Sequence, residues 1–422
     1  MKKIKFLNGK VKSKREHLQE RMTREYLRED IDVKLELIRS LIPIGLDYVN
    51  KLLQDEVERL AGKRYSREAG CNNSRWGNQG GSIYLGDQKV PMVYPRVRDT
   101  LNNKEVKLEG YLKLQEPKKM SEELLRKVLN GISCRRYSEC VEKIPESFGL
   151  SASSVSRKFI EASGKKLREF YERRLDNQEF VCILIDGKCF YEDSMIIAVG
   201  ITVSGEKVIL GFVQSATENS VVCSEFLEHL LERGLKIEGG ILCIIDGSKG
   251  LRKSIEKVFG RYALVQRCQW HKRENVLKHL TKEKQAVFKT KLQEAYEEPT
   301  YMSAKSRLIN IGNELRIINE SAYNSLCEGM EESLTLHKLG LFEHLGTSLK
   351  TTNCIESIMS QIGQKTDKVD CWRNSNQKHR WLAVSLLDIE KRLQKIKGYQ
   401  HIPLLRIMIK RKLKLSDEKR VA

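Results

Sequence analysis

Five short apolar runs between residues 179 and 265 restrict the fold of this chain more than any other feature. Three of them follow one another directly, and a stretch with helical spacing precedes each of the last two. The expected order of elements is therefore βββαβαβ. The runs cover 180–185, 195–203, 207–213, 241–245 and 263–265, and the helical stretches cover 219–233 and 251–259.

That order matches the ribonuclease H-like core, in which a three-stranded antiparallel meander is joined by parallel strands through right-handed crossovers. Residues 272–349 are charged, helical in texture and too long for a loop, which indicates an all-α insertion. One more helix near Asn353 then completes the core of a mixed α/β protein. The expected parts are an N-terminal helical region (1–63), a small β-containing Gly/Arg-rich module (64–115), a helix-turn-helix DNA-binding region (116–176), the core in two pieces (177–271 and 350–400) around the all-α insertion (272–349), and a basic C-terminal tail (401–422).

The segment around Ser151 has the pattern of a helix-turn-helix motif. Two short helical patterns and the turn at 148–150 lead to Ser151, a good N-cap, and a further helix starts at Ala152. The first residues of such a helix face the base edges of DNA, but an ordinary helical hairpin packed on a core has the same pattern. The expected DNA-binding residues are Ser151, Ser153, Ser154, Arg157 and Lys158.

The strongly basic composition favours the DNA-binding interpretation. Lys and Arg number 76 against 56 Asp and Glu, which gives a formal net charge of +20. Residues 1–176 hold 38 basic and 26 acidic side chains, so much of the excess lies in front of the predicted core, where a grip on DNA is expected. No run approaches the roughly eighteen apolar residues that cross a bilayer, and the first residues lead into no secretory core, so we expect a cytoplasmic protein without a membrane partner.

Two apolar runs are followed by the same dipeptide, Asp186-Gly187 and Asp246-Gly247. Asp-Gly between apolar runs is also a hairpin signal, which competes as an explanation for Asp186. The hairpin explanation fits Asp246 less well, because the sequence after Gly247 becomes helical. Asp246 is therefore expected between a strand and a helix, which is where open sheets bind ligands. In a ribonuclease H-like sheet the two strands are neighbours, so both carboxylates are expected at strand ends, side by side on a divalent cation.

A pair of metal sites needs a third carboxylate, and Glu356 is the candidate. Thr351 or Thr352 can cap a helix that starts near Asn353, which puts Glu356 in the first turn of that helix. Acids are common at helix N-termini because the helix dipole favours them. The spacing alone therefore does not single out Glu356.

Four motifs of the chain are specific enough to indicate a family. They are Ile-Asp-Gly-Lys (185–188), Ile-Asp-Gly-Ser-Lys-Gly-Leu (245–251), Val-Gln-Arg-Cys-Gln-Trp-His-Lys-Arg-Glu-Asn-Val (265–276) and Thr-Thr-Asn-Cys-Ile-Glu-Ser (351–357). With these motifs, and with 149–157 and 369–374, the chain resembles the Mutator superfamily of DDE transposases, in its bacterial insertion-sequence branch. The resemblance extends from the Gly/Arg-rich module to Tyr399. The chain departs from the family at Ser248, because the family often has His after the second Asp-Gly.

The resemblance implies that Asp186, Asp246 and Glu356 are the catalytic, metal-binding triad of a two-metal polynucleotidyl transferase. We expect two Mg²⁺ ions per site, with Mn²⁺ able to substitute, because two ions about 3.5–4 Å apart serve the attacking and leaving oxygens of a phosphodiester. In this hypothesis Asp186 bridges both ions, Asp246 holds one and Glu356 the other. The expected enzyme binds the terminal inverted repeats of an insertion sequence, cleaves the 3′ ends and transfers them into target DNA.

The family also implies partners and a location. Both the terminal inverted repeats and the target are double-stranded DNA. Two element ends must be joined together, which implies a homodimer or a higher synaptic assembly. We expect such a protein to be associated with the bacterial nucleoid.

Cys268 and His271 have the spacing of half a zinc site, without a second half. In the family this signature lies near the catalytic acids, where a neutral His271 would act with the triad by orienting the scissile phosphate or a metal-bound water. A packed strand end with a hydrogen-bonded histidine gives the same pattern. Arg373 is a further expected DNA contact, beside Trp372, which either stacks on an unpaired base or anchors the core.

Two other functions fit the same residues. A ribonuclease H-like nuclease or resolvase would cut nucleic acid without joining strands. A helix-turn-helix regulator would bind DNA and keep an inactive core as a scaffold, although the retention of all three acids argues against it.

Overall fold

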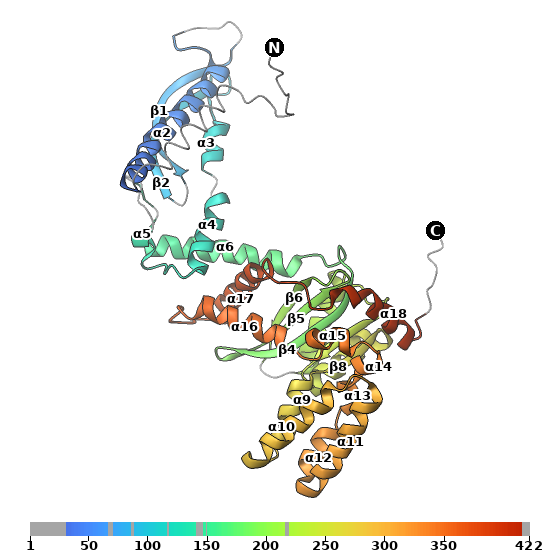
Figure 1. Cartoon of the computed structure of the whole chain (residues 1–422). Coiled ribbons are helices and arrows are strands. Elements are labelled where there is room, and N and C mark those ends of the chain that lie inside the picture. The colour runs from blue at the N-terminus through green and yellow to red at the C-terminus, as the bar shows by residue number, and fades with distance from the viewer. Residues whose placement is uncertain are drawn as a thin grey trace, which may run out of the picture. The chain divides into compact units, whose positions relative to one another are not determined.

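The protein is described by a computed structural model that covers residues 31–65, 71–85, 88–115, 118–140, 147–148, 150–215 and 219–415 (Figure 1). The chain divides into two compact units, Met1–Lys127 with Ile132–Lys158 and Val128–Gly131 with Phe159–Ala422. Its sheets and many helices confirm the mixed α/β class. The boundaries of the smaller parts stay predictions.

A long helix and a small antiparallel sheet form the core of the first unit. The strands pair in the order β1-β2-β3. Leu53 and Val57 of the helix are fully buried against Ile83 and Val97 of the sheet. Residues 1–30 of the predicted helical region lie outside the described residues. The elements in this part of the chain are α2 (Ile31–Ala61), β1 (Asn73–Leu85), β2 (Gln88–Asp99), β3 (Lys104–Val106), α3 (Glu109–Leu114), α4 (Lys118–Leu129) and α5 (Tyr137–Cys140).

Helix α6 (Ala152–Glu172) starts where the sequence predicts it. The hydroxyl of Ser151 accepts a hydrogen bond from the backbone N–H of Ser154 at 3.4 Å, which is the geometry of an N-cap. Residue 149 of the predicted turn and residues 141–146 of the helical pattern before it lie outside the described residues. The helix-turn-helix motif therefore stays a prediction.

A five-stranded mixed sheet lies at the centre of the second unit, with the order β6-β5-β4-β7-β8. The first three strands in the chain pair antiparallel, and the last two run parallel to β4. The strands occupy the five apolar runs of the sequence. Their bounds are β4 (Phe180–Phe190), β5 (Asp193–Thr202), β6 (Lys207–Gln214), β7 (Ile241–Ile245) and β8 (Ala263–Arg267).

The first strand is longer than predicted, which corrects the placement of Asp186. Residues 187–190 stay paired with 193–196 of β5, so the hairpin turns at 191–192. Asp186 therefore lies within β4 and not at a strand end, and Asp186-Gly187 is not a turn. Asp246 does follow the last residue of β7 directly.

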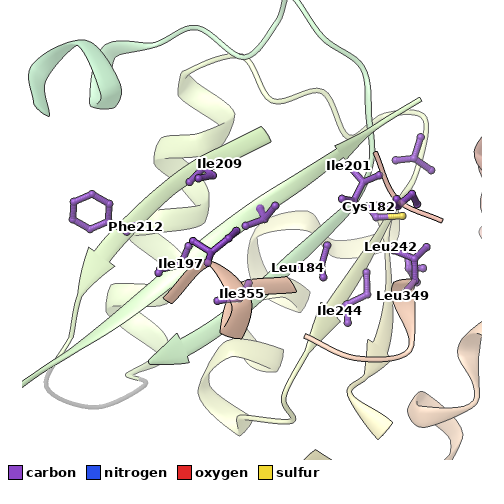
Figure 2. Close-up of a cluster of buried hydrophobic side chains, with 14 of the residues drawn as sticks. Cys182, Leu184, Ile197, Ile201, Ile209, Phe212, Leu242, Ile244, Leu349 and Ile355 are labelled. Carbon is purple, nitrogen blue, oxygen red and sulfur yellow. The ribbon is translucent and has the colours of Figure 1, made fainter. Parts of the chain in front are cut away.

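Helices cover both faces of this sheet. Side chains alternate along a strand, so Leu184 packs into one core with the C-terminal helices and Ile183 into another with α7 and α8. Figure 2 shows Ile355 and Leu349 in the same cluster of buried side chains as Leu184 and Ile244. The covering helices are α7 (Ser220–Glu232), α8 (Lys249–Phe259), α15 (Phe342–Leu349), α16 (Asn353–Thr366), α17 (Ser375–Glu390) and α18 (Ile402–Lys412), with short 3-10 turns η1 (Gly260–Tyr262) and η2 (Tyr399–His401).

Between β8 and α16 the described chain is helical, as Figure 1 shows. The longer of these helices have a core of their own, which includes Leu292, Leu308 and Leu326. No helix of the described ranges is long and apolar enough to span a membrane. The helices here are α9 (Gln269–Leu277), α10 (Lys282–Glu297), α11 (Tyr301–Ile318), α12 (Glu320–Cys327), α13 (Met330–Ser333) and α14 (Thr335–Lys338), followed by α15.

Candidate active site

Strand β4 carries Asp186 into a buried position. Its side chain follows Leu184 by two residues and so points to the face that the C-terminal helices cover. Asp186 is 1% exposed, and its Oδ2 atom accepts no hydrogen bond. Burial raises the pKa of Asp186 to about 6; attraction to Lys188 works against this rise, and repulsion from Asp246 adds to it.

Helix α16 brings Glu356 to the same place from a distant part of the chain. Ile355 is fully buried in the core, which fixes the orientation of the first turn of the helix. The neighbouring Glu356 is half-buried, and its Oε1 atom lies 3.1 Å from Nζ of Lys188 and 4.0 Å from Nε2 of His271.

The segment after β8 supplies His271, in the first turn of α9. The backbone N–H of Cys268 donates to the carbonyl of Ile245 at 2.7 Å, which ties the start of α9 to the end of β7. On the other side, the N–H of Gln269 donates to the carbonyl of Lys350, just before α16, at 2.9 Å. These two bonds hold His271 between the sheet and α16.

Three of the four expected catalytic residues converge. Asp186, His271 and Glu356 each offer a ligand atom within 4.8 Å of the others. Among the described residues, Asp246 is not part of that group. Its Oδ1 atom accepts the backbone N–H of Ser248 at 3.0 Å, where α8 begins. Asp246 is still a close neighbour, because the preceding Ile245 pairs with Ile185 of β4.

Thr352 belongs to the site, whereas the sequence suggested it only as a helix cap. It stands at the N-cap position of α16 but its side chain makes no capping bond. Thr351 accepts the N–H of Asn353 instead, at 3.4 Å. The buried Thr352 hydroxyl lies 3.5 Å from Nδ1 of His271 and donates to Sγ of Cys268 at 3.8 Å.

Cys268 supports His271 and is not a member of the candidate metal group. Its thiol is fully buried. Burial is the largest single effect and acts to raise the pKa of Cys268, but the interactions with His271 and the backbone of Thr352 together outweigh it, and the pKa is lowered.

Lys188 is a second site residue, to which the sequence motif 185–188 gave no role. Its ammonium lies between the two carboxylates, 3.2 Å from Oδ2 of Asp186 and 3.1 Å from Oε1 of Glu356. The alternation of side chains along β4 was the available signal, because residue 188 must share a face with residue 186.

The predicted DNA-binding residues lie on the surface in two places. Ser151, Ser153 and Arg157 are exposed in the first unit, whereas Ser154 and Lys158 are half-buried. In the second unit Arg373 is exposed.

Trp372 packs its ring against neighbouring aromatic residues. The ring centroids of Phe190 and Tyr191 lie 5.4 Å and 4.6 Å away, and Trp381 lies at 6.3 Å. These contacts favour the core-anchor interpretation of Trp372 over a stacking platform.

The residues present fit a divalent cation. A buried carboxylate oxygen without a hydrogen bond, as in Asp186, is stable only with a positive partner nearby. Carboxylate oxygen and imidazole nitrogen are donors that divalent metals accept. The donor set of Asp186, His271 and Glu356 therefore suits a metal ion.

The fold and the site define a mixed α/β protein with a carboxylate and histidine group around a buried aspartate, suited to a divalent cation, on the face of its sheet that the C-terminal helices cover. The chain belongs to the Mutator family of transposases, whose family model matches residues 14–395.

Named relatives agree with this assignment. The chain is 26% identical over 360 residues to the transposase for insertion sequence element IS256 in transposon Tn4001 of Staphylococcus aureus, covering 81% of this chain and 87% of that protein. It is 25% identical over 384 residues to the transposase for insertion sequence element IS905 of Lactococcus lactis, covering 88% and 93%. It is 23% identical over 330 residues to the transposase for insertion sequence element IS1201 of Lactobacillus helveticus, covering 75% and 85%.

Proposed function

We propose that this protein is the DNA transposase of an insertion sequence, and that its second unit contains a ribonuclease H-like catalytic core. The observation that carries the proposal is the convergence of Asp186, His271 and Glu356, which come from β4, α9 and α16 respectively. The strand order, with an antiparallel meander joined by two parallel strands, supports the assignment of the core. Membership of a transposase family supports the choice of DNA as substrate.

Asp186, Asp246 and Glu356 would hold two Mg²⁺ ions, with Mn²⁺ able to substitute. When bound, such ions activate an attacking oxygen and neutralise charge on the attacking and leaving oxygens of a phosphodiester. Asp246 contributes its charge from the strand beside β4. The buried position of Asp186 keeps water away from its carboxylate and strengthens every charge interaction that it makes.

His271 is proposed to position the scissile phosphate. The Thr352 hydroxyl holds the ring at Nδ1, which leaves Nε2 on the side of Glu356. A ring held in this way presents Nε2 to the phosphodiester in a fixed direction. We therefore assign His271 a role in aligning the phosphodiester with the carboxylates.

The first unit is proposed to bind the terminal inverted repeats. The N-terminus of α6 presents hydroxyl groups and Arg157 at the surface, and such groups contact phosphates and base edges in helix-turn-helix complexes. Arg373 would add a DNA contact in the second unit. Joining two element ends requires a dimer or a larger synaptic assembly, and the working location would be the nucleoid in the bacterial cytoplasm.

A strand-transfer assay with Asp246→Asn protein tests this function. Asparagine keeps an oxygen that can accept the Ser248 N–H, so the fold is retained while the charge is removed. Wild-type protein with Mg²⁺ should nick terminal repeat DNA at the 3′ end and join it to a target, whereas the variant should do neither. Nicking without joining by the wild type would favour a nuclease or resolvase, and sequence-specific binding without any cleavage would favour a regulator.

A further inference from the structure

Lys188 occupies the position where a cation would be needed. Its Nζ atom contacts Oδ2 of Asp186 at 3.2 Å and Oε1 of Glu356 at 3.1 Å. These carboxyl groups supply two of the three members of the candidate metal group. One ammonium of the protein therefore pairs with both carboxylates.

The Lys188 ammonium can be displaced from the two carboxylates without any movement of the backbone. The backbone of Lys188 is fixed, because residue 188 pairs with Met195 of β5. The lysine side chain, by contrast, is a flexible four-carbon stem with a compact charge. Its ammonium donates a hydrogen bond to Oε1 of Glu356 at 3.1 Å and forms an ion pair with Oδ2 of Asp186 at 3.2 Å. The ammonium can therefore leave the carboxylates while the strand stays in place.

The side chain of lysine carries a positive charge at neutral pH. A cation and a divalent metal ion cannot both occupy the space between the same two carboxylates. The free energy of metal binding therefore includes the cost of separating the Lys188 ammonium from the carboxylates of Asp186 and Glu356.

We propose that Lys188 is a resident cation of this site, which holds Asp186 and Glu356 in the metal-free protein, competes with divalent metal for them and, once displaced, pairs with a phosphate of bound DNA. The proposal rests on the proposed function, because it takes DNA and a divalent cation as the ligands of this site. It makes Lys188 a positioning residue that links metal loading to DNA binding.

This competition predicts a reciprocal coupling between metal and DNA. A DNA phosphate offers the released ammonium a new anionic partner, so DNA should lower the cost of displacing it. By linkage, DNA then tightens metal binding by the same factor by which metal tightens DNA binding. The coupling should depend on the positive charge at position 188.

The test measures Mn²⁺ binding to the full chain by electron paramagnetic resonance of the free ion, with and without a short duplex. Asp186→Asn protein serves as the blank for unrelated sites. For the wild type we expect weak binding that the duplex tightens about tenfold, a typical size for coupling between sites. Lys188→Met should bind Mn²⁺ about tenfold more tightly than the wild type without DNA, and the duplex should add little.

Two further variants separate competition from a structural role. Lys365→Met removes a largely buried lysine of α16 that pairs with Asp388 at 2.7 Å, away from the candidate metal group, and should leave Mn²⁺ binding unchanged. Lys188→Gln provides a second neutral variant should Lys188→Met fail to fold. A merely structural lysine would make metal binding weaker when removed, so unchanged or weaker Mn²⁺ binding in a folded neutral variant would overturn the proposal. If the wild type did not cleave DNA, the proposed function would be overturned. The Mn²⁺ affinities measured without DNA would still test the competition between Lys188 and metal.

Discussion

The hydroxyl of Thr352 lies 3.5 Å from Nδ1 of His271. The other ring nitrogen, Nε2, lies 4.0 Å from Oε1 of Glu356. Thr352 also donates a hydrogen bond to Sγ of Cys268 at 3.8 Å. A single buried hydroxyl at the start of α16 thus contacts both the histidine of the candidate site and the cysteine that supports it.

Replacing Thr352 with valine keeps the shape of the side chain and removes this hydroxyl. We expect kcat for DNA cleavage to fall at least about tenfold, as for other residues that orient metal-site ligands, with little change in KM. Stability should fall by about 1–2 kcal/mol, because buried acceptors lose a donor. The measurement is steady-state cleavage at a temperature where both proteins are folded.

Thr352→Ser is the matched control, since it keeps the hydroxyl and loses only a methyl group. It should retain most of the activity. Equal kcat for the valine variant and the wild type would show that the hydroxyl does not orient His271.

The raised pKa of Asp186 predicts a pH dependence of the metal-free protein. Its pKa is raised from 3.8 to about 6, chiefly by burial, so the folded state holds this proton more tightly than the unfolded chain. The contribution of Asp186 to stability therefore falls as the pH rises from about 4 to about 6 and stays low above that range. A shift of about two units corresponds to about 3 kcal/mol.

Urea unfolding of the wild type and Asp186→Asn protein in chelator measures this effect. The variant should be the more stable protein above about pH 6, by up to about 3 kcal/mol, and its advantage should shrink toward pH 4. Other groups titrate in the same range, so the difference between the two proteins is the informative quantity. A difference that is constant with pH would contradict the assignment of the raised pKa to Asp186.

Much of the sheet could be predicted, because each strand is a continuous apolar run and the strand order follows from local connections. The placement of Asp186 was wrong for a nonlocal reason. Asp186-Gly187 is a turn signal by itself, but residues 187–190 pair with 193–196 of β5 and extend the strand. Pairing with β5 therefore outweighed the local turn propensity of the Asp186-Gly187 dipeptide.

The candidate site could be predicted only in part. Acids near the ends of apolar runs pointed to Asp186 and Asp246, but the family resemblance was needed to choose Glu356. The roles of Lys188 and Thr352 depend on side-chain directions after folding. The sequence left open whether Thr351 or Thr352 caps α16, and in the structure the Thr351 hydroxyl accepts the N–H of Asn353 while the Thr352 hydroxyl faces His271.

Gly247 should be intolerant of any side chain. Its backbone has φ +108°, which is strained for residues with a Cβ atom. An added Cβ would also collide with the guanidinium of Arg267, which is 7% exposed and donates to the carbonyls of Gly247 and Glu328. We expect Gly247→Ala to lower stability by about 2–3 kcal/mol and to reduce cleavage, because the change displaces the adjacent Asp246.

Gly340→Ala separates backbone strain from this collision. Gly340 also has a positive φ, +68°, but an added Cβ would meet open space. The expected loss of stability is about 1 kcal/mol, with cleavage unchanged. Both variants are measured by urea unfolding and by cleavage of repeat DNA, and equal losses in the two would contradict the role given to Arg267.

Arg157 tests the proposed DNA-binding surface at the start of α6. It is exposed, and its Nε–H donates to the carbonyl of Ser153 at 3.4 Å, so the side chain runs along the helix near the hydroxyl groups of the N-terminus. Arg157→Gln should weaken binding to terminal repeat DNA and reduce the slope of log affinity against log salt by about 0.9, the value for one phosphate contact. Arg168→Gln removes an exposed arginine farther along α6 and should leave that slope unchanged, since the base-reading end of a recognition helix is its N-terminus. If Arg157→Gln kept the wild-type affinity and slope while Arg168→Gln lost both, the N-terminus of α6 would not be the DNA-binding end.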